Sequence, residues 1–386
     1  MYSFQDKDRR TASTTIQRMV GDGFCYDNQI TFYYPITYIP FYVLVLRSHR
    51  DSVISVTLCD FIDLDLLDMM KTKALLANFF MCTIAAASTG GAGDMELLLV
   101  QAIWRHGDRS PTKTFPKDPF QERNWTFGGG GFGQLSPLGM KQHMDLGKLI
   151  RKTYVDDMKF LSARYSSEEI YIRSTDTNRT IISAISNLLG MYGPNDGKAI
   201  PGIDYPAVEG WPPGLVPIAI HTVDDDTDYV ANTDAYCYRR EVLWAMAKNS
   251  SMLRAYQNVN AGLFANLTRL SGQFVTVDNF WVVRDALQIE QIHANETLRV
   301  VNTWFNDDLF KRMTTVQSQL DAYKNGVFNK TIIINGLDIG SEIQKLRGGS
   351  IFNEIMMHMN MKMKCLNVIH KGCKWMNGLK YYAYSA

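Results

Sequence analysis

Short apolar runs and amphipathic stretches alternate through the middle of the chain. Residues 96–104 (ELLLVQAIW) are almost continuously apolar, which is typical of a central strand covered on both faces. Shorter apolar runs at 169–172 and 217–221 predict two more strands, and the aromatic run at 379–386 predicts another buried one.

Three stretches between these runs have the period of amphipathic helices. The first begins at Ser136, the second follows Asp176, and the third follows Gly348-Gly349, with Ser350 as its expected N-cap. Their apolar stripes are Leu138, Leu146, Leu149, Ile150 and Tyr154; Ile181, Ile182, Ile185 and Leu189; and Phe352, Ile355, Met356 and Met359. Residues 235–335 have a mostly helical pattern with polar faces, as in a cap. Strands alternating with helices favour an α/β sheet with an inserted helical region.

The first 68 residues differ in pattern from the rest. Residues 1–20 are polar, and residues 30–46 are apolar and aromatic but are interrupted by Pro35 and Pro40. The apolar segment is at the lower length limit for a membrane span, and the two prolines argue against one. A β-rich segment is an alternative. We expect residues 1–68 to be an annotation artefact, untranslated sequence read as protein, or an unstructured extension.

Residues 69–87 have the three parts of a secretory signal peptide. A short basic run at 69–73 precedes an apolar stretch at 74–87, which ends in the small-residue cleavage pattern Ala85-Ala86-Ala87. Because signal peptides work at an N-terminus, we expect translation to start at Met69 or Met70. The alternatives are a buried helix within a larger domain and a signal anchor that is not cleaved.

Composition excludes several classes of protein. Lys and Arg number 40 against 39 Asp and Glu, a net charge of +1, so no nucleic-acid partner is expected. Hydrophobic residues at 46% exclude a disordered chain. Six cysteines are too few for a disulfide-dense scaffold of this length.

Cysteines and glycosylation acceptors agree with secretion. In an oxidising compartment Cys365 and Cys373 are close enough in sequence to pair, which leaves Cys237 as an unpaired thiol. Asn-x-Ser/Thr triplets follow the predicted signal peptide, which predicts a glycoprotein. They lie at Asn124, Asn178, Asn249, Asn266, Asn295 and Asn329.

Candidate chemistry begins where the strand 96–104 ends. Arg105, His106, Gly107, Asp108 and Arg109 follow it directly, and ligands bind outside the carboxyl ends of strands in open α/β sheets. Two arginines that flank a histidine can cradle a dianion, because guanidinium groups match phosphate oxygens and keep their charge. These cations disfavour protonation of His106, so its neutral imidazole can act as a nucleophile at mildly acid pH. The alternative is an ordinary surface loop rich in Arg and His.

A second basic cluster, Arg173-Ser174-Thr175-Asp176, follows the predicted strand at 169–172. If it projects from the same sheet edge, Arg173 completes a positive pocket. The alternative is that Arg173 caps the preceding strand. In either case we expect Asp176 to be the N-cap of the next helix.

Several motifs occur in an order that chance does not produce. They are LLLVQAIWRHGDRSP at 97–111, QLSPLGMKQHMDLGKLIRKTY at 134–154, YIRSTDTNRTIISA at 171–184, PIAIHTV at 217–223, KLRGGSIFNEI at 345–355 and LKYYAYSA at 379–386. In these motifs residues 94–386 resemble the histidine acid phosphatases, a branch of the phosphoglycerate-mutase-like superfamily, and most of all the animal lysosomal and prostatic type, including nematode members. The resemblance implies a three-layer fold with helices on both faces of the sheet and an inserted helical cap at about 235–335.

The resemblance also implies roles for the basic residues. His106 looks like the nucleophile that becomes a phosphohistidine, and Arg105, Arg109 and Arg173 resemble the family's phosphate-binding arginines. No metal or other cofactor is implied, since the arginines take the place of a metal. The implied substrates are phosphate monoesters, and animal relatives often form homodimers.

The sequence departs from the family at its C-terminal end. In the family, the strand that resembles 379–386 is followed by a His-Asp pair, whose His contacts phosphate and whose Asp protonates the leaving alcohol. Here the sequence stops at Ala386. We therefore expect a truncated chain and a poor catalyst, since a general acid contributes about 10²–10⁴-fold. A partner for Cys237 and the membrane anchor of some relatives would lie beyond this point.

Three other polar residues have weaker claims on the site. Asp108 is an alternative general acid, although orienting an arginine or facing solvent is the more ordinary role. His143 and His221 match family positions, and we interpret both as structural.

The leading hypothesis is an acid phosphatase of the secretory pathway, lysosomal or extracellular. The second is a non-catalytic phosphate-binding pseudoenzyme, or a truncated inactive product, that kept the cradle and lost the acid. The third is a phosphoglycerate-mutase-like phosphotransferase. The signal peptide and glycosylation acceptors argue against this third hypothesis, because such enzymes are cytosolic.

Overall fold

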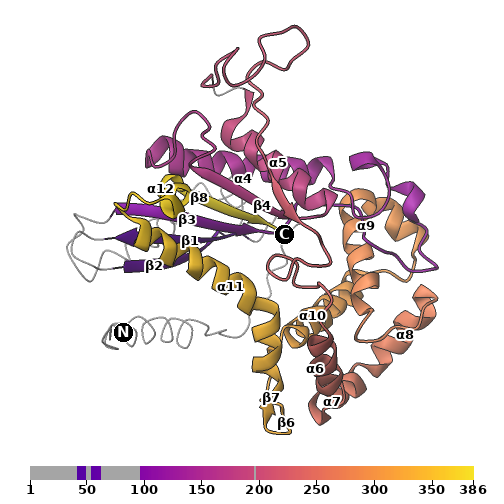
Figure 1. Cartoon of the computed structure of the whole chain (residues 1–386). Helices are drawn as coiled ribbons and strands as arrows, with labels where there is room; N and C mark the ends of the chain where they lie inside the picture. The colour runs from indigo at the N-terminus through magenta and orange to yellow at the C-terminus, as the bar shows by residue number, and fades with distance from the viewer. Residues whose placement is uncertain (1–40, 49–53, 62–95, 195–196) are drawn as a thin grey trace, which may run out of the picture. The chain divides into compact units, whose positions relative to one another are not determined.

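The computed structural model describes residues 41–48, 54–61, 96–194 and 197–386. In this part of the chain a mixed six-stranded sheet has the strand order β2-β1-β3-β8-β4-β5 (Figure 1). Strands β3, β8, β4 and β5 run parallel, whereas β1 is antiparallel to both β3 and β2. The strands are β1 (Phe41–Ser48), β2 (Ile54–Phe61), β3 (Glu96–Trp104), β4 (Ile170–Thr175), β5 (His221–Val223) and β8 (Tyr381–Ser385).

The predicted strands are confirmed in part. β3 spans 96–104 as expected, and every residue of β8 is buried. β4 runs three residues further than predicted, to Thr175, so Arg173 lies within the strand and not after it. The strand expected at 217–221 was misplaced, because the strand is at 221–223, where it pairs with β4. Pro217 has no N–H to donate to a ladder, which disfavours an earlier start.

Helices cover both faces of the sheet, which confirms the three-layer α/β class (Figure 1). On one face lie α4 (Pro137–Ile150), its π-helical continuation η3 (Arg151–Asp157) and α5 (Asn178–Tyr192), whose buried side chains pack with those of β3, β4 and β8. On the other face, α11 (Ile339–Cys365) and α12 (Lys374–Gly378) pack against Leu99 and Tyr382.

The helix α5 buries a different face from the predicted one. Ile185 and Leu189 are 45% and 38% exposed, whereas small and polar residues such as Ser183, Ala184 and Asn187 are buried. The reason is a close crossing with α4 at two glycines. A Cβ added at Gly147 would lie 1.9 Å from the carbonyl oxygen of Asn187, and one at Gly190 would lie 2.1 Å from that of Met144. Backbone contact of this kind selects small residues, so the bulky stripe faces outward.

Two predicted helix caps were wrong. α11 begins at Ile339, with the Asp338 side chain accepting from the Ser341 N–H, and it passes through Gly348-Gly349 without ending. Ser350 is therefore interior to the helix. The N-cap of α5 is Thr177, one residue after Asp176, because β4 continues to Thr175 and leaves only a short connection.

Residues 235–335 are mostly helical, as expected. This region holds five helices with their own hydrophobic core, which includes Phe280, Leu287, Leu320 and Tyr323. The helices are α6 (Tyr238–Lys248), α7 (Ser251–Val259), α8 (Ala261–Ser271), α9 (Phe280–Val301) and α10 (Asp307–Lys324), and the short strands β6 (Ile333–Ile334) and β7 (Leu337–Asp338) follow.

The structure places part of the N-terminal region in the sheet. β1 and β2 pair in register over their full length, and β1 covers the edge of β3. Residues 41–48 and 54–61 are thus strands and not an unstructured extension. β1 overlaps the segment 30–46 for which a β-rich structure was the alternative, whereas β2 lies outside that segment. The proposed artefact and start site at Met69 or Met70 remain predictions, and the signal peptide at 69–87 lies outside the described residues.

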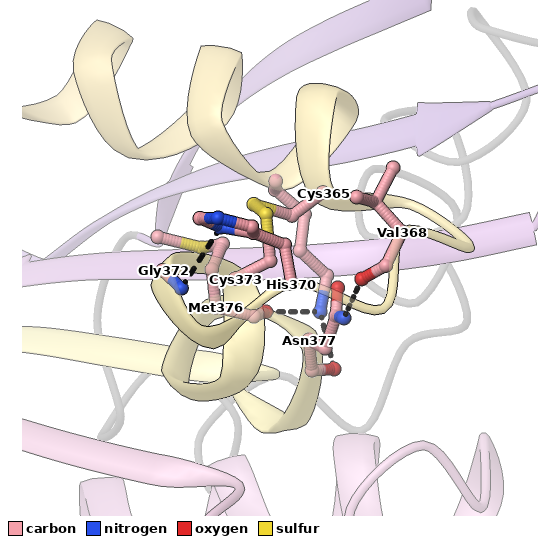
Figure 2. Close-up of a disulfide and its surroundings, with 8 residues drawn as sticks. Cys365, Val368, His370, Gly372, Cys373, Met376 and Asn377 are labelled. Carbon is pink, nitrogen blue, oxygen red and sulfur yellow. Dashed lines mark hydrogen bonds between the residues drawn. A yellow bond between two sulfur atoms is a disulfide. The ribbon is translucent and has the colours of Figure 1, made fainter.

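The disulfide expected between Cys365 and Cys373 is confirmed (Figure 2). It closes the connection between α11 and α12, where the Asn377 side chain also donates to the Val368 carbonyl, at 3.0 Å. The ammonium group of Lys362 donates to three backbone carbonyls at 376–379. Burial lowers the pKa of this ammonium group to about 8. Cys237 is a free thiol.

The predicted glycosylation acceptors lie at or near the surface. Asn266 is half-buried, and the other five are exposed. An acceptor must be accessible, so this placement is compatible with glycosylation, which remains a prediction. None of the helices in the described ranges is long and apolar enough to cross a membrane.

The glycine crossing predicts a large effect of one methyl group. Gly190→Ala should destabilise the protein by about 3 kcal/mol, because its Cβ meets backbone that cannot rotate away. Gly349→Ala is the matched control, since a Cβ there meets nothing within 4 Å, and it should gain about 1 kcal/mol from helix propensity. Urea unfolding of both variants measures the difference. Equal effects would contradict the crossing.

Candidate active site

The loop at 105–109 follows β3 and is pinned between α4 and α5. A Cβ added at Gly107 would lie 2.5 Å from the Gly139 carbonyl oxygen, in the first turn of α4, so this position requires glycine. The Gly107 N–H donates to the hydroxyl of Ser183 on α5, at 3.1 Å. The loop is therefore fixed at the carboxyl end of the sheet, as the sequence predicted.

His106 is held in one tautomer. Its side chain is almost buried, and its Nδ1 lies 2.7 Å from the carbonyl oxygen of Gly107. A carbonyl oxygen only accepts, so Nδ1 must carry the proton and Nε2 keeps its lone pair. The His106 backbone N–H donates to the Ala386 carbonyl at 2.7 Å, so Ala386, which directly follows β8, lies beside the backbone of His106.

Burial and nearby cations keep this imidazole neutral. Burial is the largest cause, followed by the positive charges of Arg105, Arg109 and Arg179, and together they hold the pKa of His106 well below its usual value. The Gly107 hydrogen bond opposes this shift only in part. A neutral imidazole with a free Nε2 lone pair is the reactive form of a histidine nucleophile.

Arg109 is oriented by an acidic residue on α9. Its Nη1 and Nη2 donate to the two carboxylate oxygens of Asp285 at 2.9 and 3.1 Å, and Nη1 also donates to the Ser110 carbonyl. Its buried Nε has no hydrogen-bond partner among the described residues. The guanidinium edge formed by Nε and Nη2 thus keeps donors for a further anion, and that edge suits a phosphate bidentately.

His143 contacts the backbone of Arg105. The Arg105 side chain is exposed, yet crowding by protein atoms and then the charge of Arg109 lower its pKa to about 10. His143 is fully buried on α4, and its Nε2 lies 3.1 Å from the Arg105 carbonyl oxygen. Burial lowers the pKa of His143 to about 4. Its contact supports the backbone of the loop, which agrees with the structural role expected for it.

Arg179 joins the cluster although the sequence analysis did not select it. It lies in the first turn of α5, beyond the end of β4, and its charge acts on both His106 and Arg105. No hydrogen bond or ion pair joins its side chain to the described residues, and its Nε is buried. A Cβ added at Gly133 would lie 3.6 Å from its Nη1, so the glycine-rich loop borders it. Two features of the sequence could have pointed to Arg179: it lies at the start of a predicted helix, and it belongs to the same motif, 171–184, as Arg173.

Arg173 has acidic partners in the structure. Its Nη1 donates to both carboxylate oxygens of Glu354 at 2.9 Å, and its Nη2 donates to Asp228 at 2.7 Å. The hydroxyl of Tyr384 also donates to Glu354. Arg173 was predicted beyond the strand end, whereas β4 includes it, and its side chain pairs with Glu354 on α11 and with Asp228. The structure thus brings together Arg105, His106 and Arg109 of the predicted set, and Arg179 lies close enough for its charge to act on His106. A phosphate-binding role for Arg173 stays a prediction.

Asp108 and His221 also have defined partners. The Asp108 carboxylate receives a hydrogen bond from the Ser136 hydroxyl and lies 2.7 Å from Nε2 of His293 on α9. Asp108 was predicted to orient an arginine or to face solvent, and in the structure it does neither. His221 is exposed and stacks on Tyr171 with ring centroids 4.3 Å apart. This contact lies on the sheet edge and agrees with a structural role.

A pair of buried carboxyl groups lies between α9 and the segment after the loop. Glu290 is fully buried, and burial and then the carboxyl of Asp118 raise its pKa to about 10. Burial also raises the pKa of Asp118, whose carboxylate accepts from the Phe120 N–H at 2.8 Å and from the Thr114 hydroxyl. The sequence pattern around Asp118 and Glu290 does not indicate that they pair, because they come together only in the folded protein.

The site contains arginines where other phosphate sites use metals. Across the described ranges, no group of three or more His, Cys, Asp or Glu is placed to hold a metal ion. A buried neutral imidazole surrounded by guanidinium groups at the carboxyl edge of a mainly parallel sheet is suited to binding a phosphate group.

Comparison with known proteins identifies the family. The model of the histidine phosphatase superfamily (branch 2) matches residues 96–386, and the chain belongs to this family of phosphatases. It is 34% identical over 313 residues to Putative acid phosphatase 10 of Caenorhabditis elegans, covering 80% of this chain and 75% of that protein. It is 35% identical over 271 residues to human prostatic acid phosphatase, covering 68% and 62%. A solved structure of Klebsiella sp ASR1 phytase matches with a TM-score of 0.45 and 14% identity, over 73% of this chain and 68% of that one.

The carboxyl pair predicts a stability that falls as pH rises. Both folded-state pKa values are raised, so the folded protein holds more protons than the unfolded chain above about pH 4.5. Stability is then fully present below the unfolded pKa and is lost toward pH 10, by up to about 1.4 kcal/mol per pH unit for one proton.

Glu290→Gln should flatten this slope, because the amide cannot ionise. The free energy of unfolding, measured by urea between pH 4.5 and 8, tests this for the parent and the variant. Glu296→Gln, at an exposed position of the same helix, is the control and should keep the parent slope. An unchanged slope in Glu290→Gln would show that the pair does not hold a proton.

Proposed function

We propose that this protein is an acid phosphatase that hydrolyses phosphate monoesters through a phosphohistidine on His106. The observation that carries the proposal is the His106 imidazole, protonated at Nδ1 toward Gly107 and kept neutral beside three arginines. The named relatives are acid phosphatases, which supports the same reaction class.

In the proposed first step, Nε2 of His106 attacks phosphorus and the bond to the ester oxygen breaks. Arg105, Arg109 and Arg179 stabilise the charge on the transferring phosphoryl oxygens, with Arg109 using its Nε and Nη2 edge. The ester oxygen leaves with a proton from a general acid. In the second step, water attacks phosphorus, the N–P bond breaks, and inorganic phosphate and neutral His106 are released.

The general acid is the part of the mechanism carried over from the family. There it is the Asp of a His-Asp pair after the strand that β8 resembles. The Ala386 carbonyl lies on the His106 N–H, so residues following position 386 would emerge next to the nucleophile. A general acid at that place would contribute about 10²–10⁴-fold to turnover.

The second candidate is a phosphate-binding protein without turnover. The observation that favours it is that the arginine cluster and its support from Asp285 do not depend on a general acid. Both candidates share a location in the secretory pathway or lysosome, for which the prostatic and lysosomal relatives are the support. Binding of inorganic phosphate without hydrolysis of p-nitrophenyl phosphate would favour this candidate.

Substitution at the nucleophile tests the enzyme proposal. His106→Ala should lower kcat by about 10³-fold or more, because no other described group replaces the Nε2 lone pair. Inorganic phosphate should still bind, since the arginines remain. Hydrolysis of p-nitrophenyl phosphate at pH 5 measures the first quantity, and competition or calorimetry measures the second. Unchanged turnover in His106→Ala would refute the assignment.

Matched variants of Arg179 and Arg173 test which of these two residues is the third phosphate ligand, beside Arg105 and Arg109. Arg179→Lys should lower kcat/KM about tenfold and Arg179→Ala about 10²-fold, because the guanidinium fork is lost. Arg173→Lys should keep kcat/KM within about threefold and lower the melting temperature, since it weakens the pairs with Asp228 and Glu354. The reverse pattern would restore Arg173 as the phosphate ligand.

The charge of Arg179 should also appear in the pH dependence. The cation lowers the pKa of His106, so the parent should keep its nucleophile neutral through mildly acid pH. In Arg179→Gln one cause of the lowered pKa is gone, so the acid limb of kcat/KM should move to higher pH. A pH–rate profile of both proteins measures the limb. A downward or absent shift would contradict this electrostatic role.

A further inference from the structure

We propose that His293 is a positioning residue for the phosphate-binding loop and that it acts through Asp108. The inference rests on the proposed function and assigns a role to a residue on the helical insertion, outside the motifs that carry the chemistry. It concerns phosphate affinity, which is measurable whether or not the chain turns over.

His293 contacts the carboxylate of Asp108 directly. Nε2 of His293 lies 2.7 Å from Oδ2 of Asp108, and the same oxygen accepts from the Ser136 hydroxyl. A carboxylate only accepts, so Nε2 carries the proton. The Asp108 side chain is 5% exposed, and a hydrogen bond to a buried carboxylate is among the stronger ones in proteins.

Asp108 lies in the loop between two residues with roles at the site. It lies between Gly107, which fixes the His106 tautomer, and Arg109, which offers its free edge to phosphate. Its backbone N–H donates to Gln142 at 2.8 Å, and its carbonyl accepts from the Ser136 N–H at 2.9 Å. These backbone contacts come from α4 and its N-cap Ser136, whose hydroxyl also bonds the Asp108 carboxylate. His293 adds a contact to that carboxylate from a second element, α9.

The helix α9 contacts two consecutive residues of the loop, Asp108 and Arg109. Asp285 holds Arg109 and His293 holds Asp108, from positions about two helical turns apart. The helix departs from helical geometry at Ala294, with φ −149° and ψ 30°, directly after His293. Two contacts from one helix fix the orientation of the loop. With the Asp285 contact alone, the loop could still rotate about Arg109.

The His293 ring is itself held by aromatic side chains. Its centroid lies 5.1 Å from that of Phe127 and 5.9 Å from that of Trp125. These residues lead into the glycine-rich loop, whose Gly133 borders Arg179. His293 therefore connects Asp108 to the glycine-rich loop beside Arg179. Loss of its side chain should disturb the positions of both Arg109 and Arg179.

The test uses two substitutions that separate ring packing from hydrogen bonding. His293→Phe keeps an aromatic ring for Phe127 and Trp125 but has no donor for Asp108, and it should weaken the Kd for inorganic phosphate about tenfold. His293→Gln keeps an N–H donor and should stay within about threefold of the parent. His221→Phe, at an exposed stacked histidine away from the loop, is the control and should leave the Kd unchanged.

Three results would overturn the proposal. The first is a parent-like Kd for phosphate in folded His293→Phe. The second is an equal loss in His293→Gln and His293→Phe, which would point to packing alone. The third is an unchanged Kd with a fall in kcat confined to alkyl esters and absent for p-nitrophenyl phosphate, which would make His293 a proton donor.

A second variant covers the case in which His293→Phe does not fold. Asp108→Asn weakens the same contact from the loop side, and it should raise the Kd for phosphate in the same direction. A parent-like Kd in Asp108→Asn would then overturn the proposal. If the parent itself neither binds phosphate nor hydrolyses esters, the proposed function fails, and that result differs from every outcome above.

Discussion

The site depends on holding like charges together around a buried histidine before any anion arrives. Arg105, Arg109 and Arg179 all act on His106 in the same direction, toward the neutral imidazole. Asp285 is the acidic residue that directly offsets this repulsion, through two hydrogen bonds to Arg109. A cluster with excess positive charge that the fold pre-organises is what a dianionic phosphate stabilises most, because binding relieves the repulsion.

The fold meets this electrostatic cost with backbone constraints. Gly107 contacts the first turn of α4 at a distance that admits no Cβ, and Ser183 on α5 binds its N–H. The Gly107 carbonyl then fixes the Nδ1 proton of His106. The glycine crossing of α4 and α5 keeps these two supports together, so residues remote from the chemistry set its geometry.

The pattern of apolar residues along the chain predicted the central strand and the helices, which depend on neighbouring residues in the sequence. The run 96–104 predicted β3 and placed the loop at 105–109 at a sheet edge, since a strand covered on both faces has few alternatives. The position of Arg173 relative to the strand was mispredicted, because the end of a strand is set by its pairing with β5 and β8, which the apolar pattern does not contain. The buried face of α5 was misassigned because backbone contact at Gly147 and Gly190 outweighed the attraction of burying isoleucines.

Residues on α9 could not be found from the sequence for a different reason. Asp285 and His293 reach Arg109 and Asp108 from 176 and 185 residues away, and nothing near them in sequence marks their partners. The same holds for Glu290 with Asp118. Family motifs point to the nucleophile and its neighbours, whereas the groups that orient them are specified only by the folded chain.

The most direct test of the account is a search for the covalent intermediate. The protein is mixed with a ³²P-labelled phosphate monoester at pH 5, quenched, digested under alkaline conditions and analysed by mass spectrometry. The account predicts a phosphoryl group on His106 that is stable to base and labile to acid, as an N–P bond should be. Turnover without any phosphorylated His106, or with the label on another residue, would contradict it.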